Sequence, residues 1–327
     1  MFLAIREITA ARGRFGLIGR TVALITLLLV MLSGLTEGLS KQNTSALEAV
    51  AQEYPYVSFS TEEPAYNESE IKEEDLSGEA IALGTAQTKL EGEGAVGVMG
   101  LPAGTTIPNT KATIPEDGAV LSDTIDASGT VNIGGVDLSV EGTVAETQFS
   151  HSPVVWVSTQ TWQKVSHAPE GVVGTLALHS EEVPGSVEMS DSFSGLPAYQ
   201  SERGSLLTMQ GFLYGISALV TVAFLTVWTL QRTRDLSILR ALGASVRYLL
   251  RDALAQAALI LAAGTILGAF VGWLLGLLAS GTVPFDVSVR TIIVPAVGIW
   301  ILGMAGALVS TRRVAKANPL DALGGNA

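Results

Sequence analysis

Two side chains near the end of the first apolar run have a chemistry that their neighbours lack. Glu37 closes a membrane-length run, where a carboxylate is costly unless it is paired, reaches the interface or serves a ligand. Met31 places a thioether inside the same run, six residues earlier. Both groups can coordinate iron, so the pair is a candidate metal-ligating site. The alternatives are that Glu37 is an interface residue and that Met31 only fills space in packing.

Other residue types that support catalysis or metal binding are scarce. The chain has no cysteine, so it can form neither a disulfide nor a thiol nucleophile, and it contains no HExxH or GxSxG pattern. It also lacks the GxxxxGK[ST] loop that binds nucleotide phosphates, so we do not expect it to hydrolyse ATP. The acidic run at 68–75 is expected to be a solvated face. Three histidines lie far from the apolar runs and are expected to be surface or structural residues: His151, His167 and His179.

Four apolar runs are long enough to cross a hydrocarbon core of about 30 Å, which requires roughly 20 helical residues. We predict transmembrane helices over 15–37, 205–230, 253–280 and 291–310. The remaining segments are an amphipathic helix, a large inserted domain, a coupling segment, a short loop and a tail, at 1–14, 38–204, 231–252, 281–290 and 311–327. No small-x-small cleavage site directly follows the first run, so we expect it to remain as an anchor.

The distribution of charged residues indicates on which side of the membrane each segment lies. The segments 1–20, 231–252 and 310–327 hold 12 Lys or Arg residues against four acids, whereas 37–202 holds 26 acids against five lysines. By the positive-inside rule, both termini and the coupling segment are cytoplasmic and the inserted domain lies outside the cell membrane. The excess of acids that gives the chain its net charge of -12 lies in this outer domain, where it favours solubility and argues against binding of nucleic acid.

The inserted domain shows short β-type runs bounded by Gly, Pro and Asp, which indicates a mixed α/β module. Gly134 and Gly135 predict a tight hairpin, because adjacent glycines accept the positive φ values of a type I′ turn. Ser158 or Thr159 is expected to cap a short helix that carries Trp162. The predicted strands cover 56–60, 95–99, 131–133, 136–140, 143–149 and 154–157. The predicted fold class is an α-helical integral membrane protein with four transmembrane helices, both termini inside, and one extracytoplasmic mixed α/β domain between the first and second helices.

A basic amphipathic segment separates the second and third apolar runs. Its leucines recur every three residues, its charges occupy other faces, and Ser245 can cap the helix that follows. A solvated loop would not need this leucine stripe, so we predict a helix that docks onto another protein. The residues expected to make this contact are Arg232, Asp235, Leu239, Arg240 and Gly243.

The third apolar run repeats glycine at every fourth position, which brings these residues near one helical face. Small residues let helix backbones approach closely in a membrane, so the pattern predicts a packing face within the chain or across a dimer. The glycines are Gly264, Gly268, Gly272 and Gly276.

The order of one span, a large domain and three spans, together with segment 239–245, the glycine-rich third run and the motif at 319–323, resembles permeases of the FtsX and MacB type. These are membrane subunits of ATP-binding-cassette (ABC) transporters. The resemblance implies a homodimer of permeases that binds a dimer of ATPase subunits through the 232–245 helix. The missing phosphate loop departs from the fused MacB arrangement and assigns ATP to a separate chain.

Within this family, residues 2–8 and 34–39 are similar to hemin-efflux permeases of Gram-positive bacteria. That resemblance implies export of heme, which enters from the lipid and is expelled outward; no cofactor of the chain's own is expected. Met31 and Glu37 would then be axial ligands of the heme iron from the paired helices of a dimer, and Phe212 and Tyr214 would be walls of the site. The alternatives are export of an antimicrobial peptide, macrolide or lipid, and a non-transporting transmitter that activates a cell-wall hydrolase.

Overall fold

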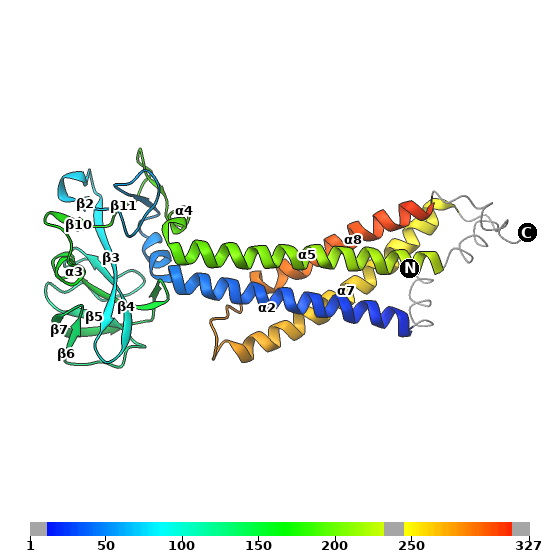
Figure 1. The fold of residues 1–327 in the computed structure, drawn as a ribbon, viewed down its shortest axis with the longest axis horizontal. Coiled ribbons are helices and arrows are strands. Elements are labelled where there is room, and N and C mark those ends of the chain that lie inside the picture. Colours follow the sequence, from blue (N-terminus) through cyan, green and yellow to red (C-terminus); the bar gives the residue numbers. More distant parts are fainter. Residues whose placement is uncertain (1–11, 232–244, 316–327) are drawn as a thin grey trace, which may run out of the picture. The chain divides into compact units, whose positions relative to one another are not determined.

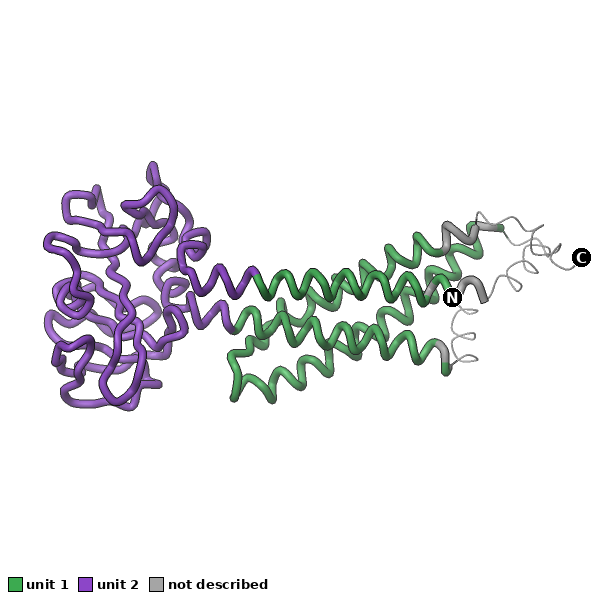
Figure 2. The backbone as a smooth tube through the Cα atoms, in the orientation of Figure 1, with its two compact units in different colours: residues 1–38, 205–327 green, residues 39–204 purple. Residues whose placement is uncertain are grey.

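The computed structural model describes residues 12–231 and 245–315 (Figure 1). The chain forms two compact units (Figure 2). We call residues 1–38 and 205–327 the helical unit, and residues 39–204 the β-rich unit.

Four long helices contain the membrane-length stretches: α2 (Arg12–Ala51), α5 (Pro197–Gln231), α7 (Val246–Ala279) and α8 (Val289–Ala315). Each is long and apolar enough to cross a membrane, which confirms the four predicted helices by length and composition. Ser245 caps α7, because its Oγ accepts a hydrogen bond from the backbone N–H of Tyr248 at 3.2 Å. Residues 246–252, predicted as part of the coupling segment, therefore form the first turns of α7.

The glycines of α7 lie against α2. A Cβ added at Gly264 would lie 2.9 Å from the carbonyl oxygen of Gly19, and one at Gly268 would lie 2.3 Å from that of Ala23. At Gly272 the nearest atom is Cγ1 of Val30, at 2.8 Å. These three positions therefore pack two helices of the same chain, and each has room for hydrogen only.

Gly276 faces a different neighbour, the loop between α7 and α8. A Cβ there would lie 2.5 Å from Cε1 of Phe285, and one at Gly34 of α2 would lie 2.2 Å from Cζ of the same ring. The Phe285 ring thus occupies a slot between two glycines on two helices. The backbone N–H of Asp286 also donates to the carbonyl oxygen of Gly34 at 3.0 Å. The loop between α7 and α8 is thereby fixed to α2 at Gly34.

The β-rich unit is built around one ten-stranded sheet and a two-stranded sheet, β10–β2. The large sheet has the order β12-β1-β11-β3-β4-β9-β5-β7-β6, with β8 paired to β9. Its strands β4 and β9 are parallel, as are β5 and β7. A pairing of Leu90 with Ile133 joins β3 to β6 and closes six strands into a ring. The strands are β1 (Tyr56–Ser58), β2 (Ile71–Lys72), β3 (Ile81–Leu90), β4 (Gly94–Leu101), β5 (Ala119–Ser122), β6 (Thr130–Ile133), β7 (Val136–Val144), β8 (Gln148–Phe149), β9 (Ser152–Ser158), β10 (Val172–Gly174), β11 (Leu176–His179) and β12 (Val187–Glu188).

Short helices complete this unit and confirm its mixed α/β character. They are α3 (Thr159–Ser166), α4 (Met189–Ser192) and the 3-10 turns η1 (Glu73–Asp75) and η2 (Phe193–Gly195). Ser158 caps α3 by accepting from the N–H of Thr161, so of the two predicted caps the first is confirmed. Gly134 and Gly135 have φ values of 59° and 86°, as the predicted hairpin requires.

The strand predictions differ from the structure in two ways. Six strands were not predicted: β2, β3, β5, β10, β11 and β12. The longest of them, β3, has small residues around Gly84 that do not alternate between apolar and polar types. That composition follows from packing: a Cβ at Gly84 would lie 2.2 Å from the indole of Trp162 on α3. The strand predicted over 143–149 is wrong as one element, since β7 ends at Val144 and β8 begins at Gln148.

Candidate functional site

Glu37 lies on α2 in the helical unit and is partly exposed. Its neighbour Thr36 is buried and receives a hydrogen bond from Nε2 of Gln210 on α5, at 2.9 Å. The hydroxyl of Thr36 in turn donates to the carbonyl oxygen of Leu32 at 2.7 Å. The hydrogen bond from Gln210 therefore links α5 to α2 one residue before Glu37.

A second contact holds α2 from another side. The loop before α8 covers both Gly34 and Gly38; a Cβ at Gly38 would lie 2.1 Å from the carbonyl oxygen of Pro284. Glu37 therefore sits on a stretch of helix that α5 and the α7–α8 loop both fix. Gln210 and Phe285 were not among the residues predicted for this site. An amide within an apolar run was a visible signal for Gln210, whereas the role of Phe285 depends on contacts that only the fold creates.

Met31 does not share a face with Glu37. The two residues are six positions apart on one continuous α-helix, so their side chains project about 120° apart. Met31 is also partly exposed. A single copy of α2 therefore cannot direct both side chains at one point, and two helices would be needed to present them to opposite faces of a flat ligand.

The two candidate wall residues on α5 also point in different directions. Phe212 is 69% exposed, on a strip shared with Ile216 and Leu219. Tyr214 turns toward α8, where its ring lies 3.1 Å from a Cβ built at Gly298. Within one copy of the chain, Phe212 is open to a ligand or partner and Tyr214 belongs to the packing between helices.

The residues predicted to contact an ATPase lie outside the described residues. Arg232, Asp235, Leu239, Arg240 and Gly243 all fall in the segment 232–244, and the C-terminal motif at 319–323 follows the last described residue.

The three histidines lie in the β-rich unit, as the sequence suggested, but they are not alike. His179 is buried, its Nε2 lies 2.8 Å from Oγ of Ser58, and burial lowers its pKa. His167 ends α3 in the left-handed conformation with φ of 52°. His151 contacts Glu202. Among the described residues, no three His, Asp or Glu side chains are grouped to hold a metal ion.

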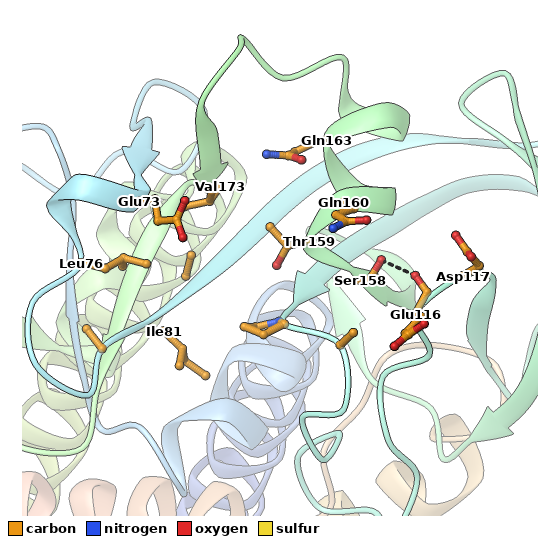
Figure 3. A pocket seen from close by; sticks show the side chains of 14 residues that line it. Glu73, Leu76, Ile81, Glu116, Asp117, Ser158, Thr159, Gln160, Gln163 and Val173 are labelled. Atoms are coloured by element: carbon orange, nitrogen blue, oxygen red, sulfur yellow. Dashed lines mark hydrogen bonds between the residues drawn. The ribbon is translucent and has the colours of Figure 1, made fainter.

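The β-rich unit also contains a cavity of about 750 Å³ (Figure 3). Three exposed carboxylates, Glu73, Glu116 and Asp117, share its lining with Gln160 and Gln163 near the start of α3. Oγ of Ser158 donates to the carbonyl oxygen of Glu116 at 2.9 Å. Glu73 belongs to the acidic run at 68–75, and its exposure agrees with the expected solvated face.

Part of the chain matches a known protein family, and the whole chain is similar to known permeases. Residues 208–319 match the model of the FtsX-like permease C-terminal family. The putative hemin transport system permease protein HrtB of Staphylococcus haemolyticus is 25% identical over 350 residues, which cover 99% of each chain. HrtB of Staphylococcus epidermidis is 25% identical over 349 residues, and an uncharacterized ABC transporter permease of Mycobacterium tuberculosis is 21% identical over 352 residues, each again over 99% of both chains.

Proposed function

We propose that this chain, which matches an FtsX-like permease domain at 208–319, is an ABC transporter permease that exports heme from the membrane. The proposal of heme as the substrate rests on one observation. The chain is similar over its whole length, and not only in one domain, to relatives named as hemin transport permeases. In this proposal the permease acts as a homodimer, both termini face the cytosol, and a separate dimeric ATPase subunit hydrolyses ATP.

The geometry near Glu37 supports a binding role for this carboxylate. It is partly exposed, and the helix that carries it is fixed by Gln210 on one side and by the Phe285 loop on another. A rigid helix presents a ligand group at a defined position, which lowers the entropic cost of binding. The diverging directions of Met31 and Glu37 fit a dimer in which each iron ligand comes from a different copy of α2.

The Phe212 strip supplies the apolar surface that a porphyrin needs. The exposed side chains of Phe212, Ile216 and Leu219 follow one another along α5. Heme is a flat apolar ring, so burial of such side chains against it would contribute binding free energy in proportion to the area removed from water. Tyr214 supports this surface indirectly, because its ring packs α5 against α8 at Gly298.

Hemin titration of the purified permease tests the proposal. We expect wild-type protein to bind hemin with a shifted Soret band, and Glu37→Gln and Met31→Leu each to alter that band and weaken binding about tenfold or more. Glu48→Gln, also on α2, and Met304→Leu, on α8, are matched controls that should bind as wild type does. A Soret band and affinity unchanged in both Glu37→Gln and Met31→Leu would show that these residues do not ligate the iron.

The same titration separates the alternatives. A permease for peptides, macrolides or lipids would not bind hemin specifically. A transmitter that activates a cell-wall hydrolase needs an outer surface for its partner, and none of the large hydrophobic residues of 39–204 is exposed. Hemin tolerance of a strain that lacks the chain is the matching test in cells: a tolerance equal to that of the parent strain would contradict heme export.

A further inference from the structure

One histidine joins three elements of the β-rich unit. His151 lies in the turn between β8 and β9, and its backbone N–H donates to the carbonyl oxygen of Gln42 on α2 at 2.9 Å. The N–H of Ser150 donates to the carbonyl oxygen of Asn43 at 3.1 Å. On the other side, Nε2 of the imidazole lies 3.0 Å from both carboxylate oxygens of Glu202 on α5. The turn is thus fastened to α2 by its backbone and to α5 by this ring.

The backbone of the turn is held in an unfavourable conformation. Ser150 and His151 have φ values of 47° and 63°, in the left-handed region that non-glycine residues enter only when their surroundings fix them there. The contacts to α2 and α5 supply that constraint. Gln87 of β3 adds a hydrogen bond to the carbonyl oxygen of Ser150 at 2.8 Å. Loss of the contacts would let the turn relax.

A buried amide fixes the position of the carboxylate. Asn43 is 1% exposed, and its Nδ2 donates to the carbonyl oxygen of Leu39 and to Oε2 of Glu202, each at 3.2 Å. The same nitrogen lies 3.0 Å from Nε2 of His151. Glu202 therefore cannot turn away from the histidine without losing a bond to α2.

Both ring nitrogens of His151 face oxygen atoms. Nε2 also lies near the amide nitrogen of Asn43, whose two hydrogens have acceptors in Leu39 and Glu202. Nε2 faces the Glu202 carboxylate, and Nδ1 lies 3.3 Å from Oε1 of Gln42. A neutral imidazole carries one N–H, so one of its nitrogens would present a lone pair to an oxygen. The imidazolium has an N–H for each. The contacts around the ring thus match the protonated form.

Glu202 is the ring's ionic partner. On the hairpin, Glu146 accepts a hydrogen bond from Nε2 of Gln148, and on α5 Arg203 donates to Oη of Tyr199. Lys41 precedes Gln42 on α2. The contacts to the ring from α2 are neutral amides, and that from α5 is a carboxylate.

We propose that His151 is a proton-operated clamp, which holds the β8–β9 turn to α2 and α5 when it is protonated and loosens the turn when it is not. Histidine is the side chain that ordinarily changes charge between pH 5 and 8. Both helices continue into the helical unit, so the clamp sets their spacing where they enter the β-rich unit. The inference does not depend on what the permease transports.

Hydrogen exchange on the full-length permease in detergent tests the clamp. The amides of Ser150 and His151 are donors in the turn, so their protection reports whether it is closed. After correction for intrinsic exchange, we expect wild-type protection in this turn to be about two- to fivefold higher at pH 5.5 than at pH 7.5, the range of a partly exposed ion pair.

Two variants remove the clamp without changing the turn's backbone. His151→Asn keeps a residue that tolerates positive φ, and Glu202→Gln keeps the shape of the carboxylate. Both should lose the pH dependence. His167→Asn is the matched control, since it replaces a second histidine with positive φ in the same unit, and it should behave as wild type. A wild-type turn whose protection does not change with pH, or a pH dependence that survives in Glu202→Gln, would overturn the proposal.

Discussion

The closest approach between α7 and α2 gives the sharpest stability prediction. Replacing Gly268 with alanine puts a Cβ 2.3 Å from the carbonyl oxygen of Ala23, 2.8 Å from Cβ of Thr26 and 3.0 Å from the carbonyl carbon of Ala23. Two of these three atoms belong to the backbone of α2. No side-chain rotation can relieve such a clash, so the helices must separate.

The cost follows from the distances. Restoring an ordinary carbon–oxygen contact requires a shift of roughly 1 Å, and a gap of that size forfeits about a quarter to a half of the dispersion energy of the atoms beside it. Overpacking of this kind typically costs about 1–3 kcal/mol. The higher helix propensity of alanine returns at most about 1 kcal/mol. We expect Gly268→Ala to lower the free energy of unfolding by about 1–2 kcal/mol.

Gly16→Ala is a matched control on α2, because a Cβ there meets no atom within 4 Å. It should be neutral or stabilising by up to about 1 kcal/mol, so the two substitutions have opposite expected signs. Reversible unfolding of the purified protein in mixed micelles, followed by tryptophan fluorescence, measures both. If Gly268→Ala proves as stable as Gly16→Ala, the close packing of α7 on α2 is not as described.

Two further predictions concern the other packed groups. Gly34→Ala should lower the free energy of unfolding by about 1–3 kcal/mol in the wild type, because the added Cβ meets the Phe285 ring. In a Phe285→Ala background the loss should be less than about 1 kcal/mol. Equal losses in the two backgrounds, measured by a double-mutant cycle, would show that the Phe285 ring does not pack against Gly34. Burial lowers the pKa of His179 below 6.5, so the unfolded chain binds the extra proton more readily and stability falls as the pH drops below about 6.5. His179→Gln should flatten this fall between pH 7 and 5 in unfolding followed by tryptophan fluorescence, and an unchanged profile would contradict it.

Local patterns in the sequence identified the elements that depend on local rules. The four long helices follow from apolar length, which the bilayer thickness sets. The caps at Ser158 and Ser245 and the glycine hairpin follow from backbone hydrogen bonding and positive φ over a few residues. Strand β3 was not predicted, because its small residues are required only by packing against Trp162, which lies far along the chain.

The candidate site likewise has features that are local in the sequence and features that depend on helix packing. Local sequence is enough to identify groups that could bind a ligand, a carboxylate at Glu37 and a thioether at Met31, since side-chain chemistry and distance along an apolar run are local properties. The surroundings of these two groups depend on tertiary contacts. The bond from Gln210 to Thr36, the Phe285 ring between Gly34 and Gly276, and the outward direction of Phe212 all depend on which helix faces meet. Helix pairing is a collective result of packing over many residues, so no spacing within one segment can reveal it.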